Sequence, residues 1–242
     1  MKNQKPLPGI SFVTGFFWGI TVLAVALALL IFFLSAGSFL ACSNYLQVIA
    51  AFAGGVALLV LWQQSRDRTF LLWTAAGFLL WGFSNIGWYV NTLMGLRSQS
   101  FPAIFDTWLI LSIFIMGYAL WNGLPGKKIS LPVLSALLVA CLIVPVGIIV
   151  VSGISMATLA TLGYFLSCGL LIAGGLDLSP GRQPLVTIGS FLFALAFVIY
   201  PLREMYMVSA PVLSVIGPVV CAGLALIVLG LFSGSPDPAK PA

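Results

Sequence analysis

One short stretch of this apolar chain, WGFSNIGWYVNTLMG at residues 81–95, concentrates side chains that could bind a small polar molecule. On an α-helix, Trp81, Asn85 and Trp88 fall at positions i, i+4 and i+7, which form one face. Indole rings can stack on a ligand and an amide can hydrogen-bond to it, whereas an unpaired amide in hydrocarbon costs several kcal/mol. We therefore expect this face to point into the protein.

The few charged residues could complete the same site. Arg97, Asp106 and the pair Arg203–Glu204 adjoin the ends of apolar segments that would all finish on one side of a bundle. If those segments are neighbours, the charges meet around the aromatic face and form a concave site typical of small-ligand pockets. The residues predicted to bind a ligand are Trp81, Asn85, Trp88, Tyr89, Asn91, Asp106, Arg203 and Glu204.

The same residues also suit a structural role. Trp and Tyr gather at both interfaces of a membrane as aromatic belts. Asn and Ser join helices by hydrogen bonds worth about 1 kcal/mol each. Asp106 could cap the helix that it begins, for about 0.3–1 kcal/mol, or it could pair with Arg203 or Arg97. Trp81 and Asn85 favour the pocket, because they lie too deep along the helix for an aromatic belt.

The sequence carries no pattern of catalytic or metal-binding residues. It has no histidine, only five acidic residues, and four cysteines without the spacing of a metal site. No Asp, Glu, Lys or Arg lies near the middle of an apolar segment, where a proton relay would place one. We expect a non-enzymatic protein with no catalytic residue, no metal and no cofactor. The net charge of +5 comes from scattered basic residues and does not indicate nucleic-acid binding.

Membrane-spanning helices are the elements that would position the polar face. Hydrophobic residues make up 61% of the chain and charged residues 6%, against about 25% charge in soluble domains. Continuous apolar runs of roughly 20 residues suit helical spans rather than a β-barrel. The sequence predicts an all-α polytopic transmembrane bundle with eight helices, at residues 12–34, 45–63, 70–91, 104–122, 131–151, 155–176, 185–202 and 211–232. A single domain would cover residues 1–232, with a disordered polar tail at 233–242.

The basic residues orient this bundle. With eight spans, both ends of the chain share one side, which then holds eight of the ten Lys and Arg residues, while Arg97 and Arg203 lie on the other. Because cytoplasmic loops are enriched in basic residues, both termini are expected in the cytoplasm. The predicted location is the inner (cytoplasmic) membrane of a prokaryote, with the polar site opening outward.

An internal repeat is also expected. WTAAGFLLW at 73–81 aligns with LVTIGSFLF at 185–193, so Gly77 matches Gly189, Trp81 matches Phe193, and Trp88 matches Tyr200. The second and sixth spans each carry a glycine pair, at 54–55 and 174–175. These matches suit two four-helix halves in parallel orientation, a 4+4 repeat, although apolar helices also resemble one another by chance.

Residues 68–120 further resemble a known family. Arg68 and Trp73 open a helix, Gly77 follows, the aromatics Trp81 and Trp88 lie toward its end, and Pro102 and Asp106 begin the next helix. This order resembles the multi-span sensory module, with seven or eight helices, at the N-terminus of bacterial diguanylate cyclases and related signalling proteins. PAIFD at 102–106 lacks the Ser and Ala of the usual turn, and no output domain follows. The resemblance implies a stand-alone sensor that acts through a membrane or cytoplasmic signalling partner, or a fragment of a longer signalling protein.

The sequence thus predicts a sensor-like or regulatory integral membrane protein with a ligand pocket between the third, fourth and seventh spans. Its expected partners are the lipid bilayer, a small-molecule ligand and a signalling partner, but no nucleic acid. A structural or assembly subunit of a larger membrane complex and a small-solute transporter are the alternatives. A transporter would accumulate solute in vesicles, a subunit would co-purify in fixed stoichiometry, and a sensor would bind its ligand without moving it.

Overall fold

The computed structural model describes residues 10–34, 37–94, 101–124, 129–176, 183–206 and 215–233. The helices in these ranges are α1 (Ile10–Leu34), α2 (Gly37–Gln64), α3 (Thr69–Leu93), α4 (Ile104–Gly123), α5 (Leu131–Ser152), α6 (Met156–Gly175), α7 (Pro184–Tyr206) and α9 (Ile216–Ser233). All eight are long and apolar enough to cross a membrane. The predicted all-α bundle of eight spans is confirmed, and the protein is an integral membrane protein.

Two helices differ from the predicted spans by five residues or more at their first residue. α2 begins at Gly37 rather than at residue 45, so the small and polar residues around Asn44 belong to the helix. α9 begins at Ile216 rather than at residue 211. Pro218 then lies in the first turn, where its missing N–H costs no helical hydrogen bond. The polar tail from residue 234 onward lies outside the described residues, as do Arg97 and most of the basic residues that set the predicted orientation.

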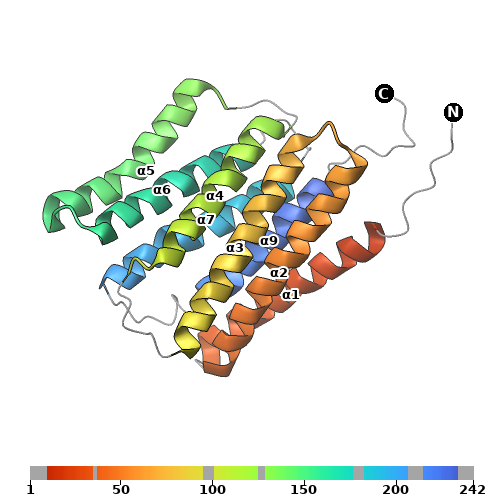
Figure 1. Ribbon diagram of the computed structural model, residues 1–242, viewed down its shortest axis with the longest axis horizontal. Helices are drawn as coiled ribbons and strands as arrows, with labels where there is room; N and C mark the ends of the chain where they lie inside the picture. The colour runs from red at the N-terminus through yellow and green to blue at the C-terminus, as the bar shows by residue number, and fades with distance from the viewer. Residues whose placement is uncertain are drawn as a thin grey trace.

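Six helices form a closed ring. Each of α2, α3, α4, α6, α7 and α9 packs against the next in this order, and α9 packs back against α2. Of the other two, α1 lies outside against α9 and α2, and α5 lies outside against α6. Figure 1 shows α5 and α1 at opposite edges of the bundle, with the remaining helices running between them.

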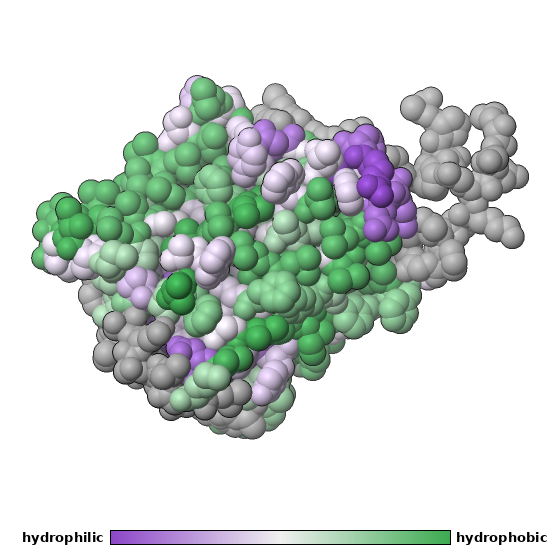
Figure 2. Space-filling model, viewed as in Figure 1, coloured by the Kyte–Doolittle hydropathy of each residue, from purple (hydrophilic) through white to green (hydrophobic). Residues whose placement is uncertain are grey.

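The surface follows the demands of a bilayer. Figure 2 shows mainly hydrophobic side chains along the helices and a hydrophilic cluster over the turn between α2 and α3. That turn exposes Gln63, Gln64, Arg66 and Asp67. The guanidinium of Arg66 lies 4.4 Å from the centre of the Trp62 ring, so the cation rests on an aromatic face at this end of the bundle.

The packing of α3 on α4 recurs in α7 on α9. A Cβ on Gly77 would lie 3.0 Å from the carbonyl oxygen of Ser112 and 2.5 Å from the side chain of Met116. A Cβ on Gly189 would lie 2.7 Å from the carbonyl oxygen of Gly223 and 3.0 Å from the Ile227 side chain. Glycine is needed at both positions, because the neighbouring helix approaches too closely for a side chain. The recurrence agrees with the expected 4+4 parallel repeat.

Candidate ligand-binding site

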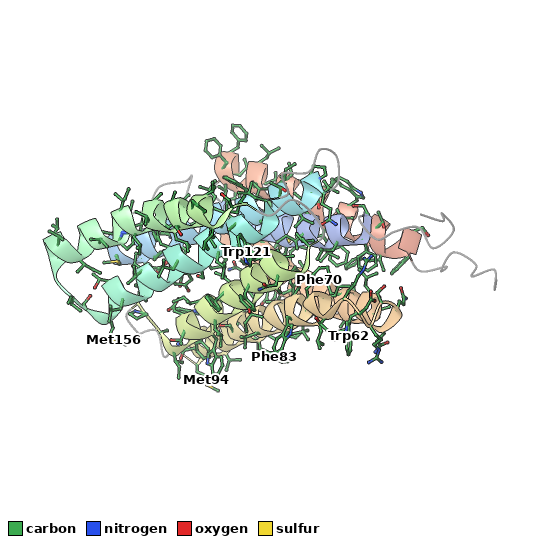
Figure 3. The ribbon with its side chains drawn as sticks, turned by 90° about the horizontal axis from the view of Figure 1, so that it is seen from above. Trp62, Phe70, Phe83, Met94, Trp121 and Met156 are labelled. Carbon is green, nitrogen blue, oxygen red and sulfur yellow. The ribbon has the colours of Figure 1, made fainter. Side chains whose placement is uncertain are left out.

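A cavity of about 340 Å³ lies at the end of the bundle where α3 and α7 end and α2 and α9 begin. In Figure 3, Met94 marks this end of the α2–α3 pair and Trp62 marks the opposite end. The volume falls in the range of small-ligand pockets, roughly 300–1,000 Å³. Five helices line the cavity, through Asn44, Gln47, Trp81, Asn85, Trp88, Tyr89, Leu109, Phe197, Tyr200, Arg203, Glu204, Ile216, Gly217 and Val220.

Six of the eight predicted site residues line this cavity: Trp81, Asn85, Trp88, Tyr89, Arg203 and Glu204. Asn91 and Asp106 are buried but are not among the lining residues. The fourth span contributes only Leu109, whereas α2 and α9, which the sequence did not assign to the site, provide five lining residues between them. Whether these residues bind a ligand stays a prediction.

The predicted face of α3 does point into the bundle. Trp81 is fully buried, and its ring contacts Phe193 and Phe197 of α7 at centroid distances of 6.0 and 6.3 Å. Asn85 Nδ2 donates to the carbonyl oxygen of Trp81 at 2.9 Å, so one amide proton is satisfied within the helix. Ser84 Oγ instead donates to the carbonyl oxygen of Phe105 at 2.7 Å, and this residue therefore joins α3 to α4.

Two buried polar atoms of the lining residues have no hydrogen-bond partner among the described residues. They are the indole nitrogen Nε1 of Trp81 and the hydroxyl of Tyr89. The Tyr89 ring stacks on Tyr45 of α2, with centroids 5.5 Å apart and planes 6° from parallel. Leaving a buried donor unpaired costs about 1–3 kcal/mol.

The other polar groups lie around these atoms. Gln47 Nε2 donates to Asn44 Oδ1 at 3.3 Å, and both side chains face the N-terminal turn of α9. Arg203 Nε lies 3.9 Å from Glu204 Oε1, and these side chains are 39% and 36% exposed. A partly exposed pair at this distance contributes little to stability, so both charges remain available to a ligand or to solvent.

Asp106 does not form the ion pair with Arg203 that was considered from the sequence. Its carboxylate is fully buried and accepts three hydrogen bonds, from the Ala103 backbone N–H at 2.7 Å, the Tyr164 hydroxyl at 2.8 Å and the Tyr200 hydroxyl at 3.1 Å. The Ala103 bond is the helix-capping role expected of a carboxylate in the first turn. The long Arg203 side chain keeps its charge near water, while the tyrosine hydroxyls reach the interior.

Tyr200 takes part in both the cavity and the hydrogen-bonded group around Asp106. It lines the cavity, and its hydroxyl donates to Asp106, which in turn caps α4. The sequence did not identify Tyr164, Asn44, Gln47 or Gly217. The internal repeat held the missing signal, because Asn44 and Tyr164 each lie ten residues before the first glycine of the pairs at 54–55 and 174–175.

The described lining residues therefore offer donors, acceptors, aromatic faces and one charge of each sign. No group of three His, Cys, Asp or Glu residues that could hold a metal ion occurs in the part of the chain that the structure describes. Comparisons with protein-family models, with curated proteins and with solved structures found no match. The similarity to bacterial sensory modules consequently stays a prediction.

Proposed function

We propose that this membrane protein is a non-enzymatic, sensor-like receptor that binds a small molecule in the cavity lined by α2, α3, α4, α7 and α9. One observation carries the proposal: Trp81 lines this cavity although it is fully buried, and its indole N–H has no partner among the described residues. A purely structural tryptophan in a membrane interior would be expected to find an acceptor or to lie at the interface.

A sensor must also report that its site is occupied, and Tyr200 supports this part of the proposal. A ligand that shifts the Tyr200 ring would alter its 3.1 Å hydrogen bond to Asp106. Asp106 also bonds to Tyr164 of α6 and caps α4, so the change would reach two helices that lie against each other. A ligand shifts such an equilibrium only by its difference in affinity for the two arrangements.

The binding test uses a variant that fills the cavity. Asn85 lies eight residues after Gly77, and Phe197 lies eight residues after Gly189, so the two positions correspond in the internal repeat. Asn85→Phe therefore gives α3 the residue that α7 has at the corresponding position. The matched control is Ile86→Phe, which adds the same ring on the exposed side of α3. Both variants and the wild type would be placed in lipid nanodiscs and screened by thermal unfolding with a panel of neutral, zwitterionic and charged solutes.

We expect at least one solute to stabilise the wild type and Ile86→Phe but not Asn85→Phe. Stabilisation of all three proteins alike would place binding elsewhere and overturn the proposal, as would a panel in which nothing binds. Proteoliposome uptake of the binding solute separates a receptor from a transporter, because a receptor leaves the internal concentration unchanged. Co-purification of a second protein in fixed stoichiometry would instead favour the subunit role.

The proposed orientation places both termini in the cytoplasm and the cavity outside. It is tested with single cysteines at Met94, which lies at the cavity end of α3, and at Asp67, in the α2–α3 turn; both side chains are exposed. The exposed native Cys42 would first be replaced by alanine. An impermeant thiol reagent added to intact cells should label the cysteine at 94 and not the one at 67. The reverse pattern would turn the cavity toward the cytoplasm.

A further inference from the structure

The cavity wall carries two opposite charges side by side. Arg203 and Glu204 are the only charged side chains among the described lining residues, and they are 39% and 36% exposed. Arg203 Nε lies 3.9 Å from Glu204 Oε1. Charge-assisted hydrogen bonds are shorter, about 2.7–2.9 Å, so this pair leaves both groups with unused hydrogen-bonding capacity.

This pair of charges disfavours a ligand with a single charge. A cation attracted to Glu204 would lie beside the Arg203 guanidinium, and an anion attracted to Arg203 would lie beside the Glu204 carboxylate. In each case repulsion by the second group cancels part of the attraction by the first. A zwitterion avoids this loss, because it can place each of its charges next to the opposite charge of the protein.

The aromatic lining favours a particular cation. On α7, Phe197, Tyr200 and Glu204 lie at positions i, i+3 and i+7, which form one face of the helix, and all three line the cavity. α3 adds three more aromatic lining residues, Trp81, Trp88 and Tyr89. Aromatic rings attract ammonium groups, and quaternary ammonium ligands are bound by such groups of rings. A primary ammonium is more strongly hydrated and loses more when it leaves water.

Arg203 suits the other end of a zwitterion. A guanidinium presents its N–H donors in a planar fork that matches two oxygens of a carboxylate or phosphate. Because the charged atoms of Arg203 and Glu204 lie within 3.9 Å of each other, the complementary charges of the ligand must also be close together. A betaine meets this condition, since one methylene links its quaternary nitrogen to its carboxylate.

We infer that the cavity binds a small zwitterion of the betaine type, with its quaternary ammonium against Glu204 and its carboxylate against Arg203. This inference rests on the proposed receptor function and adds the chemical class of its ligand. A quaternary ammonium close to an oxyanion also occurs in the phosphocholine headgroup of lipids. The shared chemistry could therefore come from water or from the bilayer, and the experiment separates the two sources.

Glycine betaine and two analogues of nearly the same shape test the inference. tert-Butylacetate has carbon in place of the charged nitrogen, and betaine amide has a neutral amide in place of the carboxylate. Binding would be measured by calorimetry in nanodiscs of phosphatidylglycerol, which has no zwitterionic headgroup, with empty nanodiscs as the blank. Glu204→Gln and Arg203→Gln each remove one charge. Asp67→Asn and Arg66→Gln are the matched controls, in the exposed turn between α2 and α3 at the opposite end of the bundle.

We expect glycine betaine to bind the wild type, and each analogue to bind on the order of tenfold more weakly, the difference that one charged contact makes. Glu204→Gln should weaken glycine betaine by a similar factor without weakening tert-butylacetate, which has no cation. Arg203→Gln should likewise weaken glycine betaine without weakening betaine amide, which has no anion. A mere change of cavity shape would weaken all three ligands. The two control variants should change none of the affinities.

The inference is overturned if glycine betaine does not bind, if an analogue binds as tightly, or if each variant weakens all three ligands equally. Nanodiscs of phosphatidylcholine then identify the source. Weaker binding of glycine betaine in them shows that the lipid headgroup competes for the cavity, and equal binding indicates a ligand from water. If an uncharged solute binds instead and loses binding in Asn85→Phe, the receptor function stands and only the ligand class falls.

Discussion

Two groups of residues lie at the same end of the ring of helices, at positions that correspond in the internal repeat. We call them the closed corner and the open corner, because one is filled by hydrogen-bonded side chains and the other lines the cavity. The closed corner consists of Asp106, Tyr164 and Tyr200, where the hydroxyls bond to the carboxylate and the two tyrosine rings lie 5.6 Å apart. The open corner consists of Asn44, Gln47 and Gly217, which line the cavity. The internal repeat relates the two corners. Asp106 lies ten residues before Met116, which packs against Gly77, and Gly217 lies ten residues before Ile227, which packs against Gly189.

The difference shows how a repeated bundle makes a single site. Glycine and asparagine in the open corner stand where the closed corner has aspartate and tyrosine, and the smaller side chains leave space between similarly packed helices. The closed corner satisfies its polar atoms internally, whereas the lining of the cavity leaves Trp81 Nε1 unsatisfied. One corner is therefore expected to stabilise the fold, and the other to bind a ligand at some cost in stability.

The largest expected effect is on the closed corner. Asp106→Ala leaves the Tyr164 and Tyr200 hydroxyls and the Ala103 N–H without their acceptor, so the free energy of unfolding should fall by about 3 kcal/mol. Chemical unfolding in detergent micelles measures this change. Thr107→Ala, at the exposed neighbouring position, is the control and should change stability by less than about 0.5 kcal/mol. Equal losses for both variants would remove the contrast between the corners.

Tyr164→Phe should cost less, about 1 kcal/mol, since it removes one buried hydroxyl and keeps the ring contacts with Phe197 and Phe101. Combined with Asp106→Asn, it should give a coupling energy above about 0.5 kcal/mol in a double-mutant cycle. Simple additivity would mean that the 2.8 Å hydrogen bond contributes nothing, and the closed corner would then be held by ring packing alone.

Gly217→Ala fills part of the open corner. Its Cβ would lie 2.6 Å from Gln47 Nε2 and 2.8 Å from Ser43 Oγ, and these side-chain ends must shift to make room. The expected loss of stability is about 1 kcal/mol, and ligand affinity should fall as the space shrinks. Gly147→Ala, where a Cβ would meet nothing within 4 Å, is the control on another helix. A gain in stability at Gly217 with unchanged binding would separate this glycine from the cavity.

The smallest effect is expected at Arg203. Arg203→Gln removes a partly exposed pair, so stability should change by less than about 0.5 kcal/mol. With Asp106→Asn the two losses should add within about 0.5 kcal/mol, because Asp106 bonds to tyrosines rather than to Arg203. A larger coupling would show that the rim and the closed corner act as one unit.

The sequence predicted the spans and one wall of the cavity well, because both depend on periodicity along a single helix. Apolar runs of membrane length gave eight helices, and the spacing of Trp81, Asn85 and Trp88 placed one face of α3 inward. Neighbours between helices were harder to predict. α4 and α6 are apolar on nearly every side, so nothing in the local pattern indicates that Tyr164 faces Asp106.

Asn44 was missed for a related reason. The predicted second span began at residue 45, and a polar segment before it read as a loop, whereas α2 continues back to Gly37. Gly217 had no visible role until α2 and α9 were seen to be neighbours. The internal repeat was the one feature of the sequence that related distant helices, and it could have paired Asn44 with Tyr164.

The peripheral position of α5 has a consequence for how freely its sequence can vary. In its most apolar window only 6% of the residues are buried, against 78% in α9, and of the other helices it packs mainly on α6. Lipid tails do not distinguish one aliphatic side chain from another as a packed helix does. Selection should therefore accept almost any sufficiently hydrophobic residue along most of α5 and very few changes in α9. A library of apolar substitutions would map this as a broad tolerant stripe beside a narrow intolerant one.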